Sequence, residues 1–336
     1  MTATYKALRL TRFARSFRDA VEAVDLPLAA PGPGEIRVRN HWCGVNGIFD
    51  TQIARNAVDY IRIPLPTWTG VEAIGVVEAV GDGVTDFRPG DAAVTNRFTG
   101  GYREANIAPA SQFIRTPSAD RDYLALASTG VSALLALEHV GGLKDGETVA
   151  ISAAAGGLGH LLVQLAKLRG ARVIAVCGGE EKGAFVRALG ATRVIDYRRE
   201  DVGKVLAAEF PNAINLAIDT VSGPIFDAFL DNVAPLGRVV VAGAAQDLDG
   251  KPEIVTAPRI SNKLYYKGAS VRGFMNGLLT DLWPEARQRL FNLHAQGKIS
   301  VTFDARGHRG LMNVPDAVEH LLSGRSMGKV VVDLRP

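Results

Sequence analysis

A run of small residues stands where a nucleotide could be bound. Residues 153–160 have the sequence Ala-Ala-Ala-Gly-Gly-Leu-Gly-His and lie between a predicted buried strand and a predicted apolar helix. In such a unit, glycines let the backbone approach a pyrophosphate, and the N–H groups that open the helix bind its oxygens. We predict dinucleotide contacts at Ala154, Gly156, Gly157, Leu158 and Gly159. The match is imperfect because Ala154 occupies the usual place of the first glycine.

The residues at the end of the second predicted strand indicate which dinucleotide is bound. An Asp or Glu there would bind the ribose 2′-hydroxyl of NAD, but this chain has Cys177 and Gly178. Lys182 follows within the next helical turn, and Tyr197 and Arg198 follow the third strand. Each charged contact with a 2′-phosphate is worth roughly 1.5–3 kcal/mol, so two could favour NADPH by about a hundredfold or more. We therefore predict NADPH, with these five residues among its contacts.

Alternatives exist for both groups of residues. Small residues in a strand-to-helix turn can serve packing alone. Lys182 and Arg198 could be solvated surface charges, and the neighbouring Glu180 and Glu181 argue against a bound phosphate.

The elements that would position these residues show two periodicities. In the first third, apolar and polar residues alternate with period two, which predicts a β-rich domain of partly open-barrel type. Its expected strands lie at 5–10, 20–26, 35–41, 71–80 and 91–95. From about residue 120, strands alternate with helices, which predicts an α/β fold with a doubly wound parallel (Rossmann) sheet. Its expected strands lie at 148–152, 172–176, 193–195, 214–218, 239–242 and 270–274, and its expected helices at 122–137, 157–168, 181–189, 202–209 and 224–233.

The remaining segment returns to the first domain in this interpretation. Helices are predicted at 284–296 and 314–322 and a strand at 329–334, and that strand has no other obvious partner. We therefore expect a catalytic domain from residues 1–122 and 279–336, and a dinucleotide-binding domain from residues 123–278.

Composition narrows the classes of function. The 336 residues carry 38 basic and 35 acidic side chains, a net charge of +3 that is too balanced to indicate a nucleic-acid partner. Two cysteines, Cys43 and Cys177, can form neither a disulfide framework nor a four-cysteine zinc site, and they favour a cytoplasmic location. No apolar run approaches 18 residues, so we expect no transmembrane helix and no membrane partner.

Several short motifs occur together along nearly the whole chain. They are Gly-Val-Asn at 44–46, Gly-Val-Glu-Ala-Ile-Gly at 70–75, Arg-Pro-Gly-Asp at 88–91, the glycine loop, and Gly-Lys-Val-Val at 328–331. In these motifs the chain resembles the medium-chain dehydrogenase/reductase superfamily, whose members join a GroES-like catalytic domain to a Rossmann domain. Zinc-dependent members carry a Cys where this chain has Asn46 and a His where it has Val71. The resemblance therefore implies no metal, since Val cannot bind zinc.

Within the superfamily the chain is most similar to the zinc-free reductases of quinones and of activated C=C bonds. The likeness is strongest to the prostaglandin reductase branch called zinc-binding alcohol dehydrogenase domain-containing protein. It is carried by residues 68–72, 143–159, 181–185 and 270–274. Residues 48–68, which should line the substrate pocket, are longer and different.

This resemblance implies reduction of an α,β-unsaturated ketone or aldehyde by hydride transfer from NADPH to the β carbon. Charge would then build on the carbonyl oxygen, and donors aimed at that oxygen would stabilise it. Asn46 and Tyr60 are the candidate catalytic residues. Asn46 could equally cap a helix beginning near Ile48, Tyr60 could simply pack, and the proton for the α carbon could come from solvent.

Motif positions imply further cofactor contacts and an assembly. The contacts expected are at Asn46, Gly130, Ser132, Val221, Gly243, Phe274, Asn276, Ser326 and Lys329. For Lys329 the alternative is an ordinary surface residue of a strand. The active site is expected in the cleft between the domains, and a homodimer is expected to form through the edge strand at 270–274.

The function that these expectations support is an NADPH-dependent reductase of enones and alkenals. An NADPH:quinone oxidoreductase using the same site is the first alternative. A non-enzymatic NADPH-binding protein is the alternative of another class.

Overall fold

The computed structural model describes residues 3–58, 61–95, 99–248, 251 and 253–336. The chain forms two compact units. Unit 1 comprises Met1–Ser128 and Phe303–Pro336 with a short segment at 248–250, and unit 2 comprises Thr129–Asp247 and Lys251–Thr302. Residues 123–128, which we had expected in the dinucleotide-binding domain, thus belong to unit 1, and residues 279–302, which we had expected in the catalytic domain, belong to unit 2. The reason for the latter is that α10 (Trp283–Ala295) packs against α4 (Val131–Leu134) of unit 2.

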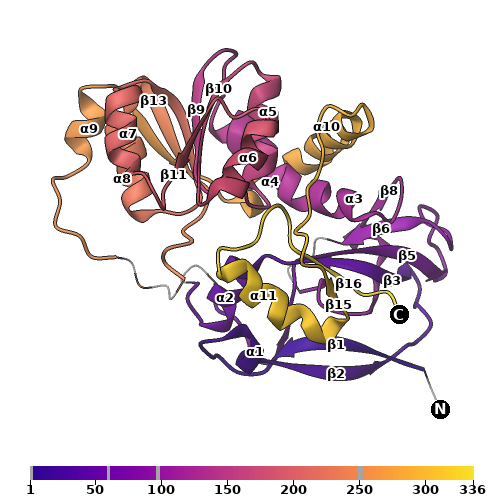
Figure 1. Ribbon diagram of the computed structural model, residues 1–336. Helices are drawn as coiled ribbons and strands as arrows, with labels where there is room; N and C mark the ends of the chain where they lie inside the picture. Colours follow the sequence, from indigo (N-terminus) through magenta and orange to yellow (C-terminus); the bar gives the residue numbers. More distant parts are fainter. Residues whose placement is uncertain (1–2, 59–60, 96–98, 249–250, 252) are drawn as a thin grey trace. The chain divides into compact units, whose positions relative to one another are not determined.

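Unit 2 is a doubly wound α/β unit. Its six parallel strands lie in the order β11-β10-β9-β12-β13-β14 (Figure 1). This is the strand order of a dinucleotide-binding sheet, so the predicted fold class is confirmed. The strands are β9 (Thr148–Ile151), β10 (Arg172–Cys177), β11 (Arg193–Asp196), β12 (Ile214–Asp219), β13 (Val233–Val241) and β14 (Ser270–Gly273). The helices that connect or follow them are α5 (Gly159–Leu168), α6 (Glu180–Ala188), α7 (Val202–Glu209), α8 (Gly223–Asp231) and α9 (Ser261–Tyr265).

Helices cover both faces of this sheet, and the strand sequences reflect it. Figure 1 shows α5 and α6 on one face and α7 and α8 on the other. Strands buried on both faces read as continuous apolar runs, as at 149–151 and 173–176, where every side chain is buried. Each fully buried Val, Leu or Ile contributes about 1.5–3 kcal/mol relative to an exposed one, so these runs anchor the strand ends that carry the site.

Unit 1 is β-rich, as predicted. One sheet has the order β2-β1-β4, and a larger one has the order β15-β16-β3-β5-β6-β8 with β7 also pairing β3. The strands are β1 (Thr4–Leu10), β2 (Val21–Pro27), β3 (Glu35–Gly44), β4 (Thr67–Trp68), β5 (Glu72–Val80), β6 (Ala92–Thr95), β7 (Ala105–Pro109), β8 (Phe113–Thr116), β15 (His308–Arg309) and β16 (Val331–Asp333). Its helices are α1 (Phe17–Ala20), α2 (Gly47–Ala54), α3 (Arg121–Ala125) and α11 (Val314–Leu322).

The late segment returns to this unit as expected. Strand β16 runs antiparallel to β3, with Val331 opposite Gly44. The return places residues near 329 beside the first motif of the chain, and the site depends on this pairing.

One helical stretch bears on the membrane prediction. Residues 121–140 run through α3, α4 and intervening π-helical turns, and by length and composition alone they could cross a membrane. The stretch was predicted as a helix and not as a membrane span, because Ser, Thr and Glu interrupt its apolar residues. Since 61% of its apolar window is buried in the protein, and buried core helices pass the same test, the finding is weak evidence for a membrane span.

Candidate active site

The glycine loop of unit 2 closes tightly between β9 and α5. A Cβ atom on Gly159 would lie 2.3 Å from the carbonyl oxygen of Ala153 and 2.6 Å from the Cα of Ala154. Only glycine therefore allows the helix to begin so close to the strand, which is the packing role expected of it. Ala154 is fully buried, and its N–H donates to the carbonyl oxygen of Val176 at 3.1 Å. Alanine is accommodated at the position where the glycine pattern usually begins, because the protein encloses its methyl group.

His160 ties this loop to the last residues of unit 2. Its Nδ1 lies 2.9 Å from the carbonyl oxygen of Gly156, and the N–H of Thr302 donates to its Nε2 at 3.2 Å. Because Nε2 accepts, the ring proton lies on Nδ1 and is donated to Gly156. One turn later, Gln164 donates to the carbonyl oxygen of Ser300 at 2.9 Å and accepts from its N–H at 2.9 Å. His160 is thus a structural residue.

Tyr197 and Arg198 lie against the tip of β10. A Cβ atom on Gly178 would be 2.7 Å from Cζ of Tyr197 and 2.8 Å from Nε of Arg198. Both side chains are exposed, and Lys182 lies in the first turn of α6, which follows the same strand tip. Burial raises the pKa of the neighbouring Cys177 thiol to about 11, so this thiol is neutral near pH 7. The residues predicted near the 2′-phosphate therefore lie together at the carboxyl ends of β10 and β11.

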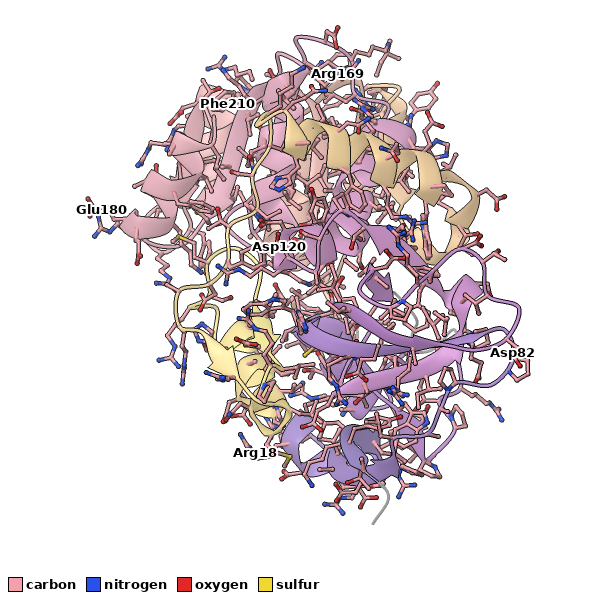
Figure 2. All side chains as sticks on the ribbon, turned by 90° about the vertical axis from the view of Figure 1, so that its right-hand side faces the viewer. Arg18, Asp82, Asp120, Arg169, Glu180 and Phe210 are labelled. Atoms are coloured by element: carbon pink, nitrogen blue, oxygen red, sulfur yellow. The ribbon has the colours of Figure 1, made fainter. Side chains whose placement is uncertain are left out.

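Asp196, at the end of β11, was missed by the sequence analysis. Its Oδ1 accepts from the N–H of Gly179 at 2.9 Å and from that of Arg198 at 3.0 Å. The hydrogen bond from Gly179 and then that from Arg198 hold the pKa of Asp196 below its usual value. This carboxylate therefore fixes the turn that carries Arg198. Glu180, which had argued against a phosphate, is exposed at the start of α6 (Figure 2).

Asp219 organises the neighbouring strand ends. Its carboxylate is fully buried at the end of β12 and accepts from the hydroxyl of Ser152 at 2.7 Å, from the N–H of Val221 at 3.0 Å and from that of Ser222 at 2.9 Å. Ser152 lies at the end of β9, so the acid joins two adjacent strand ends. It also fixes the turn that carries Val221, a predicted cofactor contact.

Two predicted contacts from separate motifs meet in unit 2. Nδ2 of Asn276 donates to Oγ of Ser132 at 2.9 Å, and the indole N–H of Trp283 donates to Oδ1 of Asn276 at 2.9 Å. The N–H of Phe274 donates to the carbonyl oxygen of Val241 at 2.9 Å, which prolongs the pairing of β14 with β13. The other predicted positions of this unit are Gly130, directly before α4, and Gly243, two residues after β13.

In unit 1, Asn46 belongs to a buried cluster of polar side chains. Its Nδ2 donates to Oε1 of Glu72 at 3.1 Å, and its Oδ1 accepts from Nζ of Lys329 at 3.2 Å. The same Nζ lies 2.6 Å from Oε1 of Glu72 and donates to the carbonyl oxygen of Val45 at 3.2 Å. The side chains of Lys329 and Glu72 are 4% and 0% exposed.

This cluster corrects two interpretations from the sequence. Asn46 does occupy the position before α2, but its side chain makes no capping hydrogen bond. Lys329 is buried and ion-paired, not an ordinary surface residue. An ammonium group has three N–H donors, and Lys329 has three acceptors within unit 1. This arrangement favours a role in positioning Asn46 over direct contact with the cofactor.

The position of Glu72 in this cluster also explains why the first motif has a glycine at position 44. A Cβ atom on Gly44 would lie 2.2 Å from Oε1 of Glu72, so any other residue would displace that carboxylate. Among the described residues, the other oxygen of Glu72 is buried without a hydrogen-bond partner, which makes its cation more important. The first, second and last motifs of the chain therefore form one set of contacts.

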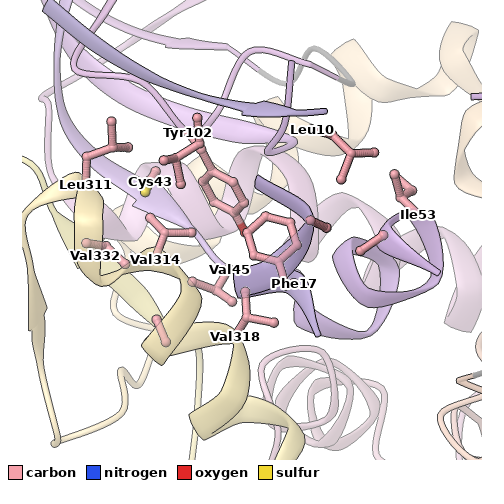
Figure 3. Close-up of a cluster of buried hydrophobic side chains, with 14 of the residues drawn as sticks. Leu10, Phe17, Cys43, Val45, Ile53, Tyr102, Leu311, Val314, Val318 and Val332 are labelled. Carbon is pink, nitrogen blue, oxygen red and sulfur yellow. The ribbon is translucent and has the colours of Figure 1, made fainter. Parts of the chain in front are cut away.

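A second buried acid supports Asn46 from the side of α2. The hydroxyl of Tyr102 donates to Oδ2 of Asp50 at 2.5 Å, and the N–H of Asn46 donates to the same carboxyl group. Burial raises the pKa of Asp50 to about 7 and also raises the pKa of Tyr102. Figure 3 shows the ring of Tyr102 beside that of Phe17 inside the apolar cluster, with 5.9 Å between the ring centroids.

A cavity of about 180 Å³ lies beside Phe17 and Asp50 in unit 1. Its walls are largely apolar and come from α1, α2 and the segment that follows α2. They include Phe17, Phe49, Asp50, Ile53, Ile63 and Trp68. Tyr60, the second candidate catalytic residue, lies outside the described residues.

Ser326 precedes a turn that a different acid anchors. The N–H of Met327 donates to Oδ2 of Asp304 at 2.9 Å, and the other oxygen of Asp304 lies 2.9 Å from Nε2 of His320. The buried Asp304–His320 pair therefore fixes the approach to Lys329.

Comparisons with known proteins agree with these two units. Residues 32–118 match the family model described as alcohol dehydrogenase GroES-like domain, and residues 157–292 match the one described as zinc-binding dehydrogenase. The chain is 34% identical to prostaglandin reductase-3 of Mus musculus, over 98% of this chain and 90% of that protein. The chain belongs to the medium-chain dehydrogenase/reductase superfamily. Within it, the chain falls in the group of quinone and enone reductases.

Other members of the superfamily support the same grouping. The chain is 31% identical to a probable quinone oxidoreductase of Leishmania amazonensis, over 98% of both proteins. It also matches the crystal structure of an Escherichia coli quinone oxidoreductase complexed with NADPH, with a TM-score of 0.81, 26% identity, and 98% and 99% of the two chains covered.

Where zinc-dependent members of the superfamily carry metal ligands, this chain has Asn46 and Val71. In the part of the chain that the structure describes, no three His, Cys, Asp or Glu side chains are gathered as a metal site would require. The nearest acids serve hydrogen bonds instead, Glu72 to Asn46 and Lys329, and Asp50 to Tyr102.

Four acids whose hydrogen bonds position the site were missed from the sequence. They are Asp50, Glu72, Asp196 and Asp219. For Asp196 and Asp219 a signal was present, because each ends a predicted strand at the edge where the cofactor was expected. For Asp50 and Glu72 the partners lie at positions 102 and 329, and no local pattern indicates them.

Proposed function

We propose that this chain is an NADPH-dependent reductase of the activated C=C bond of α,β-unsaturated ketones and aldehydes. The observation that carries the proposal is the amide of Asn46, held between Lys329 and Glu72 where zinc-using relatives have a ligand. Lys329 polarises the amide through Oδ1, which strengthens its N–H groups as donors. Glu72 takes one of the two N–H groups, and the other is available to an acceptor's carbonyl oxygen.

The residues of unit 2 fit a bound NADPH. The N-terminus of α5 offers N–H groups to the pyrophosphate, and Gly159 keeps this helix close to β9. Tyr197, Arg198 and Lys182 offer a hydroxyl group and two cations at the adjoining strand tip, which suits a 2′-phosphate better than a bare ribose. Relatives with NADPH or NADP in their descriptions support the same cofactor.

When bound, NADPH supplies a hydride to the β carbon of the acceptor. Negative charge then accumulates on the acceptor's carbonyl oxygen, and the N–H of Asn46 is the donor that unit 1 offers to it. One donor of this kind is typically worth about 10²–10³ in kcat. The α carbon takes its proton from solvent in this proposal.

Quinone reduction is a second candidate because of the likeness to quinone oxidoreductases. A quinone would use the same donor, since charge again develops on an oxygen. A non-enzymatic NADPH-binding protein would keep the unit 2 features without needing the polarised amide of Asn46.

The test measures NADPH oxidation with 1-octen-3-one and with menadione. NADPH deuterated at the transferable position should place deuterium on the β carbon of the saturated ketone. Asn46→Ala should lower kcat about 10²–10³-fold while the Kd for NADPH changes little. Turnover of menadione alone would assign the chain to quinone reduction. Tight NADPH binding with no turnover of either acceptor would favour the binding protein.

We also propose a homodimer joined through β14. This strand pairs with β13 on one side, and Met275 and Leu278 just beyond it are 42% and 83% exposed. As the last strand of its sheet, β14 has an edge that no described strand pairs, and such an edge is a template for pairing with a second copy. Light scattering should give twice the chain mass, and a monomer at micromolar concentration would rule the proposal out.

A further inference from the structure

The cavity of unit 1 has a surface that suits an apolar group. Phe17, Phe49, Ile53, Ile63 and Trp68 supply most of the wall. An apolar cavity of about 150 Å³ can stay free of water and bind benzene. At about 180 Å³ this cavity is large enough for a phenyl ring or an alkyl chain of about five or six carbons.

The buried polar groups in the wall already have partners within unit 1. The hydroxyl of Thr69 donates to the carbonyl oxygen of Leu8 at 3.0 Å. The carboxyl group of Asp50 accepts from Tyr102 and from the N–H of Asn46. A polar ligand would therefore find few buried groups to bind, and the charged side chain of Arg62, which also lines the cavity, is exposed to solvent.

The position of the cavity links it to the proposed reaction. Phe49 and Asp50 line it and lie three and four residues after Asn46, on the helix that this residue precedes. Val71, which lies directly before Glu72, lines it as well. Ile61 and Pro64, also in the wall, are exposed, so the cavity is accessible from outside.

We propose that this cavity binds the neutral alkyl or aryl arm of the acceptor, so that the preferred substrates are enones with an apolar substituent of up to about six carbons. The proposal rests on the proposed function, because it assigns the acceptor's reacting end to Asn46. Each methylene buried in the cavity raises kcat/KM about fourfold, until the cavity is filled.

A series of alkyl vinyl ketones tests this. From 3-buten-2-one to 1-hepten-3-one, kcat/KM should rise on the order of 50-fold, and it should level off beyond chains of about six carbons. A parallel series lengthened at the β carbon covers the opposite orientation of the acceptor. A flat profile in both series would overturn the proposal.

Two variants of one segment separate the cavity from general effects. Ile63→Phe places a larger side chain in the wall, so the ratio of kcat/KM for 1-octen-3-one to that for 3-buten-2-one should fall at least tenfold. Leu65→Phe makes a similar change two residues away, at a half-exposed residue that is not among those lining the cavity, and should keep the wild-type ratio. Equal ratios in the two variants would contradict the proposal.

A binding measurement keeps the inference independent of turnover. Calorimetry with 3-octanone, which has no C=C bond to reduce, should show binding to the wild-type chain and to Leu65→Phe, and binding at least tenfold weaker to Ile63→Phe. If no enone is reduced, the proposed function fails, and this measurement still decides whether the cavity binds apolar groups. Unchanged 3-octanone binding in Ile63→Phe would overturn the inference.

Discussion

Units 1 and 2 build their parts of the site in different ways. In unit 2 the glycine loop and the strand-end turns do the positioning, and Asp196 and Asp219 fix those turns through backbone N–H groups. In unit 1 the positioning is done by buried side chains that are far apart in the sequence, with Glu72 paired to the cation Lys329 and Asp50 hydrogen-bonded to Tyr102. The comparison teaches that a site positioned by backbone groups tolerates changes of surface charge, whereas a site positioned by buried pairs of polar side chains depends on each partner.

The largest effect should come from removing the cation of unit 1. Lys329→Met leaves Glu72 buried without its cation, and breaking a buried pair in this way costs about 3–5 kcal/mol of unfolding free energy. The double variant with Glu72→Gln should recover most of the loss because no charge then remains buried. Urea unfolding of the singles and the double measures this. A loss below about 1 kcal/mol for Lys329→Met would show that the Lys329–Glu72 pair contributes little to the stability of unit 1.

The second prediction concerns the pH dependence of unit 1. The folded-state pKa of Asp50, about 7, lies above the ordinary aspartate value of 3.8, so near pH 5 to 6 the native state holds a proton that the unfolded chain has lost. The stability of the wild-type protein therefore falls as pH rises from about 4 to 7. Asp50→Asn removes the titrating carboxyl group, so the stability of this variant relative to wild type should improve by roughly 2–4 kcal/mol between pH 4 and pH 8.

The control for this prediction is a carboxyl group at the surface. Asp82 lies in an exposed turn (Figure 2), and Asp82→Asn should leave the pH dependence of unfolding close to that of wild type. Parallel pH curves for Asp50→Asn and the wild-type protein would refute the assignment of Asp50 as the titrating group.

A backbone change in unit 2 should have an intermediate effect. Gly159→Ala puts a methyl group 2.3 Å from a carbonyl oxygen, and forced shifts of this kind cost about 1–3 kcal/mol. We expect a lower melting temperature for unit 2 and weaker NADPH binding. Gly203→Ala, where the added atom has no neighbour nearer than 3.5 Å, is the matched control and should be neutral or slightly stabilising. Equal effects at the two positions would contradict the steric argument.

The smallest effect should follow from removing a surface cation of unit 2. Arg198→Ala should weaken NADPH binding about tenfold, less than a buried contact would give because the side chain is exposed, and should leave NADH binding nearly unchanged. Arg199→Ala, one residue further along and 73% exposed, serves as the control. The Arg198 effect should shrink in high salt. An equal loss for NADPH and NADH would argue against a 2′-phosphate contact.

These differences also explain what could be predicted from the sequence. The strands of unit 2 were found within a few residues because each is an apolar run that ends at small or polar residues. Strand β13 was the exception, because it begins at Val233 and was predicted to begin at residue 239. Its first residues pair with β12 before a shift of register between Ile214 and Leu216, and the sequence pattern does not show this irregular pairing. The short strands β4, β7 and β8 were not predicted, since their stability comes from neighbours distant in the chain.

The same reasoning applies to the site. Gly159 and Arg198 were predictable because their roles follow from position next to a strand end. The roles of Glu72 and Asp50 were not, because a buried acid becomes intelligible only when its partner is known. Asn46 was singled out by family resemblance, and its partners came from the structure.

The pairing of Lys329 with Glu72 also has a consequence for synthesis on the ribosome. Residues 129–302 emerge before Lys329 and before β16, so unit 2 has all of its strands while unit 1 still lacks both. Until then Glu72 has no cation to accompany it into the interior, and the end of β3 from Trp42 to Gly44 lacks its neighbour β16. We therefore expect the nascent chain to fold from its middle outward, so that the unit begun first is completed last.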